Sequence, residues 1–516
     1  MQVTTALRPK PVQPQGLRNP RLRSALTFAI GAALLGTVLG IFTYNKDPLL
    51  GSALGAGVGF LIGATVGAFT DWRVGLALLV VVLLGEDSLR KAVPGSPYTI
   101  SLGKDILIAA CYLCYAFRPQ LRVPLRKADN LERWGIYFPI LAWMSFVVLE
   151  AANPALPNIL IGISGIRTWL LYFPMMVLMS NFFRSNKGAD DFLRALAYLA
   201  IPIFIITFLQ NSWYDSMPPF LRETAFRKVR TLESGGEVRY NESIFATPTL
   251  LALVCVFQLC LVIGLLKMPR SRRQRILLWI SGYCAIMSAH LSGIRTGLLF
   301  CAIAVLTCLP LIMYRFEKVP GQPRRKRPGL ILGGVIGLLF GAILVGMMDG
   351  DRAEAFWTSI QPSLVEERMD TAIAVTDDFG GGLLGNGTGS AGKSGRVMTL
   401  LGKESPSNEY VEWGTALVRY SFGLIGMWIG AILGLWALFG LMRAATLNRD
   451  APFACLRYTL WIYIGAQLSW FLFKAYPVLE NGTMGVLYWS SAGLIIGLRR
   501  LDEVQLPGVA TTSSAA

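Results

Sequence analysis

Apolar stretches of about 20 residues recur along this 516-residue chain, and a helix of that length crosses the hydrocarbon core of a bilayer. Hydrophobic residues make up 53% of the sequence and charged residues 15%, whereas a soluble domain carries roughly 25% charge. The sequence therefore predicts an all-α, polytopic membrane bundle of about fourteen transmembrane helices. We expect the spans at residues 25–45, 50–71, 73–86, 98–117, 134–152, 167–183, 192–210, 244–266, 276–293, 296–314, 330–349, 414–441, 457–473 and 484–498.

Two long polar loops and two tails divide these spans into blocks. The second loop is acidic, with ten acidic and five basic residues between Asp351 and Trp413, and a helical pattern runs from Ser363 to Ala372. Long loops are where function concentrates. The predicted organisation is a basic tail over 1–24, transmembrane helices over 25–210, 244–349 and 414–500, outer loops over 211–243 and 350–413, and a tail over 501–516.

The net charge of +17 lies in short loops between spans and not on one soluble face. Loops rich in Lys and Arg mark the cytoplasmic side, and two such loops lie at Lys267–Arg275 and Arg324–Arg327. Counting the spans in both directions from these cytoplasmic loops places both termini in the cytoplasm and both long loops on the outer side. This distribution argues against nucleic acid as a partner.

The residue types that hold metals are scarce. The chain has one histidine and eight cysteines, which lie almost all in apolar spans. Cys111 and Cys114 have the spacing of a redox motif, but inside a span they are better explained as small packing residues. We expect no metal and no cofactor.

Two arginines stand where apolar spans begin on the outer side: Arg167 and Arg295. A guanidinium at the edge of hydrocarbon is costly unless it meets water or an anion, and its five donors suit phosphate. We predict that the two arginines share an anionic ligand. The alternative is a pair of helix-end arginines whose charged groups reach the interface.

Three residues are candidates for a general base. Glu409 and Glu412 lie three apart just before the span at 414, so they share a face if helical. The alternative for them is an acidic first turn that the helix dipole favours. His290 lies five residues before Arg295 and is either a base or a neutral, hydrogen-bonded histidine.

A glycine-rich run in the second loop has Gly at 385, 387, 389 and 392. Glycines let backbone N–H groups approach an anion. No strand–helix unit flanks this run, so it is neither a dinucleotide nor a P-loop fingerprint. A flexible linker is the other interpretation.

Five segments over roughly 155–430 keep the order of a known family. The chain resembles the O-antigen ligase and O-antigen polymerase family of bacterial surface-polysaccharide glycosyltransferases. The segments are Gly165-Ile-Arg-Thr-Trp-Leu-Leu-Tyr-Phe173, Arg239-Tyr-Asn-Glu-Ser-Ile-Phe-Ala-Thr-Pro248 with its continuation to Ala252, Ser292-Gly-Ile-Arg-Thr-Gly297, Glu367-Arg-Met369 with Leu384-Gly-Asn-Gly-Thr-Gly389, and Ser407-Asn-Glu-Tyr410 with Tyr420-Ser-Phe-Gly-Leu-Ile-Gly426.

One position departs from the family pattern. Where the ligases carry histidine beside the Asn-x-Tyr element, this chain has Ser407. A serine hydroxyl is no base near pH 7 without its own activator. The departure favours the polymerase branch over the ligase branch.

The resemblance implies a GT-C-like bundle with a large helical periplasmic loop. It implies a metal-independent enzyme of the bacterial inner membrane that joins undecaprenyl-diphosphate-linked repeat units at the periplasmic side. Its partners would be the lipid-linked donor and acceptor, membrane lipid and a chain-length regulator. The implied roles are diphosphate binding by Arg167, Arg295, Arg239 and Arg368, base catalysis by Glu409, Glu412 or His290, and acceptor contacts by Asn408 and Tyr410.

A lipid-linked oligosaccharide flippase or another transporter is the alternative from a different class. Transporters place their sites near the membrane midplane. Here the clear mid-span charges are few, Lys104 and Asp105 foremost, and the polar groups gather on one outer face. This distribution favours the enzyme.

Overall fold

The computed structural model is helical apart from one short antiparallel pair, β1 (Val229–Thr231) and β2 (Glu237–Arg239), among the residues it describes. The described residues are 20–43, 48–92, 97–121, 127–213, 216–217, 229–231, 237–239, 241–245, 247–313, 370, 382–390, 414–448, 451–473 and 482–504.

The helices before the strand pair include a short 3₁₀ turn, η1, and a π-helix, η2. In chain order they are α1 (Pro20–Thr43), α2 (Pro48–Thr70), α3 (Trp72–Ala92), α4 (Pro97–Phe117), η1 (Pro119–Leu121), η2 (Leu131–Tyr137), α5 (Phe138–Glu150), α6 (Ile159–Leu170), α7 (Pro174–Ser180), α8 (Asn186–Tyr198) and α9 (Ala200–Trp213).

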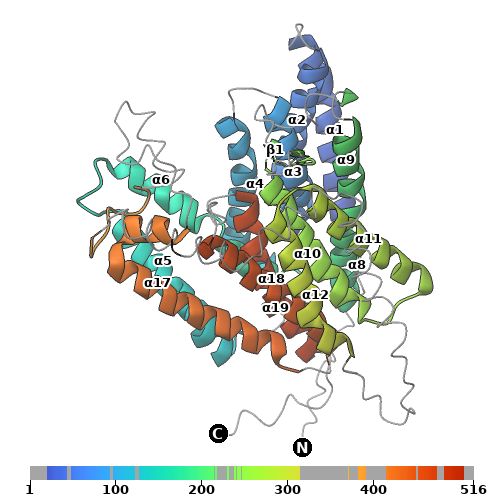
Figure 1. The fold of residues 1–516 in the computed structure, drawn as a ribbon. Helices are drawn as coiled ribbons and strands as arrows, with labels where there is room; N and C mark the ends of the chain where they lie inside the picture. Colours follow the sequence, from blue (N-terminus) through green and yellow to red (C-terminus); the bar gives the residue numbers. More distant parts are fainter. Residues whose placement is uncertain are drawn as a thin grey trace, which may run out of the picture.

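The helices after the strand pair complete the bundle. They are α10 (Pro248–Leu266), α11 (Arg272–Leu291), α12 (Arg295–Met313), α17 (Gly414–Thr446), α18 (Ala454–Phe473) and α19 (Gly482–Val504). Figure 1 shows α5, α6 and α17 on one flank, α10, α12, α18 and α19 in the middle, and α1, α2 and α9 on the other flank.

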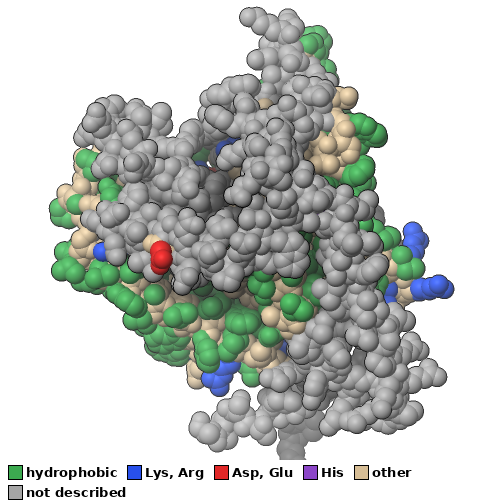
Figure 2. Space-filling model, viewed as in Figure 1, with side chains coloured by type: hydrophobic (Ala, Val, Ile, Leu, Met, Phe, Trp, Pro, Cys, Tyr) green, Lys and Arg blue, Asp and Glu red, His purple; other side chains and the backbone are tan. Residues whose placement is uncertain are grey.

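Six helical segments of the described chain are long and apolar enough to cross a membrane. Figure 2 shows hydrophobic side chains over much of the described outer surface on this face, and Lys and Arg at few places. Large apolar side chains point outward on α1 and α17, among them Leu34, Phe42, Trp428 and Phe439. An apolar exterior of this extent suits a lipid environment. The all-helical membrane class is supported; about fourteen spans and a GT-C-like arrangement remain predictions.

Buried charges form two layers at opposite ends of the bundle. At one end Lys104 and Tyr172 pack against Gly482, the first residue of α19. At the other end Arg499 and Arg500 of the same helix are buried. Seventeen residues of helix separate Gly482 from Arg499, about 26 Å at 1.5 Å per residue. That separation is close to the roughly 30 Å of a bilayer's hydrocarbon core.

The layer around Arg500 fixes the last helix to distant parts of the chain. Arg500 Nη2 lies 2.6 Å from Glu132 Oε2 on η2, and its Nη1 donates to Asn181 at 3.3 Å. Arg457, fully buried on α18, donates to the carbonyl of Ala444 at 2.9 Å. It also faces Asp502 of α19 at 3.3 Å. Paired, hydrogen-bonded charges of this kind serve to hold helices in one arrangement.

Several expected spans are interrupted helices in the structure. The span predicted at 167–183 covers the end of α6, a turn and α7, which begins at Pro174. The span predicted at 192–210 consists of α8 and α9. Apolar composition does not reveal such breaks, because a broken helix buries the same side chains as a straight one.

Small residues bring α1 and α2 into backbone contact. Gly51, Gly55, Gly59 and Gly63 recur every four residues on one face of α2. A Cβ added at Gly55 would collide with the carbonyl oxygen of Gly36 on α1. Glycines at this spacing let membrane helices approach closely, so the hairpin depends on the missing side chains.

We predict that Gly55→Ala destabilises the protein by about 1–3 kcal/mol, because the new methyl group would collide with the backbone of α1 at Gly36. The matched control is Gly31→Ala on α1, where an added Cβ has no atom within 4 Å. It should be neutral or gain up to about 1 kcal/mol from reduced chain entropy. Unfolding of the purified protein in detergent measures both, and equal stability of the two variants would contradict the close contact.

Candidate functional site

Three buried or half-buried ion pairs link α6, α4, α3 and the segment before α10. We call them the ion-pair ladder: Arg167 with Asp105, Lys104 with Glu86, and Lys91 with Glu242. Each pair joins two different elements of the fold, and successive pairs share a helix. The ladder therefore ties three parts of the chain together at one end of the bundle.

Arg167 is the most exposed member of the ladder. Its side chain is 46% exposed against 9% for Asp105, and its Nε donates to Asp105 Oδ2 at 3.1 Å. Nη2 donates to the same oxygen. The Tyr172 hydroxyl donates to the other carboxylate oxygen, Oδ1, at 2.9 Å. Asp105 thus holds the Arg167 guanidinium from one side. Its Oδ2 accepts from two of the five N–H donors of the guanidinium.

The other two pairs are shielded from solvent. Lys104 Nζ lies 2.7 Å from Glu86 Oε1, and both side chains are at most 5% exposed. Lys91 Nζ lies 3.2 Å from Glu242 Oε2 and donates to the carbonyl of Ser243 at 2.9 Å. A charge in a helical bundle is tolerated when paired in this way.

The segment that begins at Arg239 is fixed by hydrogen bonds to its surroundings. Gln210 donates to the carbonyl of Ser243 at 2.8 Å and accepts from its N–H at 2.6 Å. Asn241 Nδ2 donates to the carbonyl of Leu291 at 2.8 Å, next to the Ser292–Gly297 motif. Gly297 packs on Ala252, where an added Cβ would lie 2.7 Å from the alanine methyl. The segment at 239–252 therefore contacts Gly297 of the next motif and Leu291, the residue just before that motif.

The glycine-rich run fills a break in α17. Gly423 has φ 69° and ψ −175°, so the helix is interrupted there. The N–H groups of Asn386 and Gly387 donate to the carbonyls of Tyr420 and Ser421 at 3.0 and 2.9 Å. The N–H groups of Leu424 and Ile425 in turn donate to Gly382 and Leu383 at 3.1 and 3.2 Å.

The same run also packs on α5 and α6. Thr388 N–H donates to the carbonyl of Glu150 at 3.0 Å, and its hydroxyl donates to Val147 at 2.7 Å. An added Cβ at Gly165 would lie 2.6 Å from Gly389 N. The anion-binding interpretation is wrong for the N–H groups of residues 386–388, because backbone carbonyls already accept from them. Close backbone approach is what the glycines provide.

The remaining predicted residues fall into two sets. His290 is buried near the end of α11, and its carbonyl accepts from Gly293 N at 3.0 Å. The backbone of Arg295 begins α12 after a turn in which Gly293 has φ 73°, and that of Arg239 ends β2. The residues predicted in the second loop, Arg368, Asn408, Glu409, Tyr410 and Glu412, lie outside the described residues, as does Ser407.

Sequence reasoning missed the partners of the arginine. The sequence marks Lys104 and Asp105 as charges inside a span, but it does not show that Lys104 pairs with Glu86 and Asp105 with Arg167. The available signal was that two adjacent charges in an apolar helix require two opposite charges nearby. Tyr172 carried no signal, since a tyrosine near a span end fits an aromatic belt.

The arrangement suits recognition of an anion at Arg167. A half-exposed, pre-oriented guanidinium with unused donors binds phosphate oxygens well. The described residues contain no group of three or more His, Cys, Asp or Glu side chains placed to hold a metal. No family model matches the chain, and no curated protein matches it.

We predict that Lys104→Met destabilises the protein by about 3–5 kcal/mol, because it leaves Glu86 as an uncompensated buried carboxylate. The double variant Glu86→Leu with Lys104→Met should recover most of this loss. Lys187→Met, at an exposed lysine of α8, is the matched control and should be neutral. Unfolding in detergent measures all three, and additive losses in the double variant would show that the pair is not coupled.

Proposed function

We propose that this chain is a membrane glycosyltransferase that joins undecaprenyl-diphosphate-linked repeat units of a bacterial surface polysaccharide. The proposed site lies at the Arg167 end of the bundle, on the periplasmic side of the inner membrane. The loop Lys267–Arg275, which follows the opposite end of α10, supports that orientation.

One observation carries the proposal. The described parts of the five ordered segments gather into two contact groups: residues 165–173, 384–389 and 420–426 around the break in α17, and residues 239–252 and 292–297 around Asn241. The ion-pair ladder joins the two groups, from Arg167 to Glu242. The segments that carry the resemblance therefore meet at one end of the bundle, as residues of one site must.

In the proposed reaction an acceptor hydroxyl attacks the donor sugar, and the glycosidic bond to the lipid diphosphate breaks. Negative charge develops on the departing diphosphate, and fixed cations at its oxygens stabilise that charge. Arg167 is our choice for this role, with Arg295, Arg239 and Arg368 in support. Glu409, Glu412 or His290 would take the proton of the hydroxyl, and Asn408 and Tyr410 would hold the acceptor.

Asp105 has a defined part in this scheme. It fixes one side of the guanidinium, so the remaining donors need no reorganisation when the charge develops. It also neutralises Arg167 in the resting state, which limits binding of unrelated anions. We therefore treat Asp105 and Tyr172 as positioning residues.

The decisive assay supplies lipid-linked repeat units to protein reconstituted in vesicles. Longer glycans with released lipid diphosphate support a polymerase. Transfer to a lipid A core instead would favour a ligase, and translocation without new glycosidic bonds would favour a flippase. The buried Lys104–Glu86 pair is the observation that supports the transporter alternative.

We predict that Arg167→Ala lowers polymer formation by about 10²–10³-fold, the usual effect of removing one transition-state donor. Arg167→Lys should recover only part of this loss, because an ammonium group keeps the charge but not the fork. Arg443→Ala, at the far end of α17, should keep wild-type yield. Normal polymer from Arg167→Ala protein that reaches the membrane would refute the assignment.

We predict that Asp105→Asn separates the two effects of this carboxylate. Loss of orientation lowers kcat, while the added net positive charge at Arg167 leaves KM for the lipid-linked donor unchanged or lower. A variant with raised KM and normal kcat would contradict the positioning role. The purified enzyme's initial rates at varied donor concentration give both constants.

A further inference from the structure

Three arginines gather at the end of the bundle opposite the ion-pair ladder, and we call them the arginine cluster. Arg73 is the second residue of α3, Arg118 follows α4, and Arg184 follows α7. On α3 and on α4, thirteen residues separate the arginine from the nearest ladder residue, Glu86 and Asp105 respectively, which is about 20 Å of helix. The arginine cluster and the ladder are therefore separate sites.

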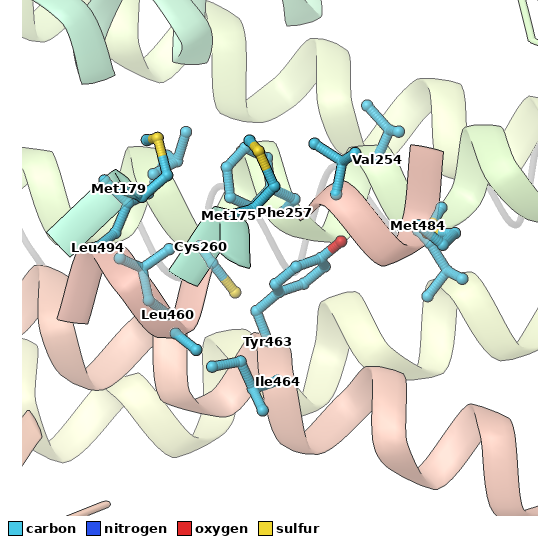
Figure 3. Close-up of a cluster of buried hydrophobic side chains, with 14 of the residues drawn as sticks. Met175, Met179, Val254, Phe257, Cys260, Leu460, Tyr463, Ile464, Met484 and Leu494 are labelled. Atoms are coloured by element: carbon cyan, nitrogen blue, oxygen red, sulfur yellow. The ribbon is translucent and has the colours of Figure 1, made fainter. Parts of the chain in front are cut away.

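The apolar core of the bundle lies between these two ends. Met175 and Met179 of α7 belong to this core, as Figure 3 shows, and Arg184 follows the far end of the same helix. The basic loop after α10 joins this end through the ion pair of Arg270 with Asp190 on α8. Because that loop is predicted to be cytoplasmic, the arginine cluster lies at the predicted cytoplasmic face.

The hydrogen-bond donors of two of these arginines exceed the acceptors around them. Arg73 Nη2 and Arg184 Nη2 both donate to the carbonyl of Leu121, at 2.9 and 3.4 Å. Trp72 Nε1 donates to the same oxygen at 3.4 Å, and the Arg73 guanidinium lies over the Trp72 ring. A carbonyl oxygen has two lone pairs, so three donors exceed its capacity. Arg73 Nε is buried and has no hydrogen-bond partner among the described residues.

The charge of the cluster is not balanced either. The ion pairs among the described residues include none of the three arginines. Arg118 and Arg184 are exposed, and Arg118 Nη1 donates to the carbonyl of Thr70 at 3.0 Å. Asp71 is buried, and its Oδ1 accepts from the backbone N–H of Arg73 at 3.0 Å. Unpaired guanidinium groups this close together suit an anion, and their fork matches phosphate oxygens.

Exposed apolar side chains border the arginine cluster. Phe117, directly before Arg118, is 78% exposed, and Leu113 is exposed one turn earlier on the same face of α4. Phe69 is exposed directly before Thr70, whose carbonyl accepts from Arg118. A basic site between the ends of membrane helices, with apolar side chains beside it, suits a lipid headgroup. A free anion would need the arginines alone, so the apolar border favours a lipid.

We propose that the arginine cluster binds the phosphate of an anionic glycerophospholipid in the cytoplasmic leaflet, with the acyl chains along α2 and α4. Arg118 and Arg184 donate to the phosphate oxygens, and Arg73 adds its charge from behind. The bound lipid joins the ends of α3, α4 and α7, and it stabilises the folded protein because it binds that state alone. The inference goes beyond the proposed function and does not rest on it, since the site lies at the opposite end of the bundle.

The test titrates the purified full-length protein in neutral detergent with dioleoyl phosphatidylglycerol or dioleoyl phosphatidylcholine, which share their chains and differ in net charge. Native mass spectrometry counts the bound lipids at each concentration. We expect saturable binding of phosphatidylglycerol, about tenfold tighter than that of phosphatidylcholine, because each arginine near the headgroup contributes. Equal affinities for the two lipids would overturn the proposal.

A double variant locates the binding. Arg118→Gln with Arg184→Gln should weaken phosphatidylglycerol binding about tenfold and leave phosphatidylcholine binding unchanged. The matched control is Arg133→Gln with Arg443→Gln, which removes two exposed arginines from the same end of the bundle and should bind as wild type does. Unchanged affinity in the first variant would overturn the proposal, as would an equal loss in both.

A single variant covers the case in which the double variant fails to fold. Arg184→Gln leaves the Leu121 carbonyl with the donors of Arg73 and Trp72, so it should fold as wild type does. It should lose part of the affinity for phosphatidylglycerol. Full affinity in this variant would contradict the assignment of Arg184.

Inorganic phosphate distinguishes a lipid site from a site for the free anion. Phosphate should displace no more phosphatidylglycerol than chloride does at the same ionic strength, because the acyl chains contribute to lipid binding. Complete displacement by phosphate but not by chloride would overturn the lipid assignment in favour of free phosphate. The binding needs no donor, acceptor or turnover, so its absence would leave the proposed function standing.

Discussion

The pairing of charges inside an apolar bundle is the constraint on which the rest of this structure depends. Lys104, Asp105 and Glu86 are buried in the bundle, and none of these charges is tolerable there alone. Each finds its partner on another helix, so the ion pairs fix which helices are neighbours and at what height. Apolar contacts are less selective than ion pairs, because the hydrophobic effect is non-directional. The second layer, around Arg500 and Glu132, acts in the same way at the other end.

The same requirement explains the broken helix α17. An interruption in a helix leaves backbone donors and acceptors that lipid cannot satisfy. At Gly423 these groups bond to residues 382–387 of the preceding loop, which are glycine-rich because two backbones must approach without Cβ atoms between them. The break in turn brings Phe422 against Trp169, two residues after Arg167, with ring centroids 5.4 Å apart. Irregular backbone and ion-pair ladder therefore meet on the α6 helix that carries the candidate site.

Much of this architecture was predictable from local sequence, and the parts that were not share one cause. Apolar run length gives the membrane class, and the setting of Arg167 beside hydrocarbon identifies it as unusual. The pairing of Arg167 with Asp105, 62 residues away, is a fact of helix packing that no local pattern contains. The span expected at 73–86 is really α3 extending to Ala92, because Asp87, Arg90 and Lys91 are held in ion pairs. The glycine run was misjudged for the same reason: its partners in α17 are remote.

The balance of charge in the ladder bears on what the site requires. Its three cations face three carboxylates, so an approaching diphosphate meets no net positive charge from the ladder itself. Only Arg167 combines exposure with unused donors, and its field is reduced by Asp105. A dianionic group would need further cations from outside the ladder. The backbones of Arg239 and Arg295 lie within three residues of Asn241 and Ser292, in the contact group at the ladder's other end. Under the proposed function, the diphosphate of the lipid-linked donor would supply the negative charge that these two arginines require.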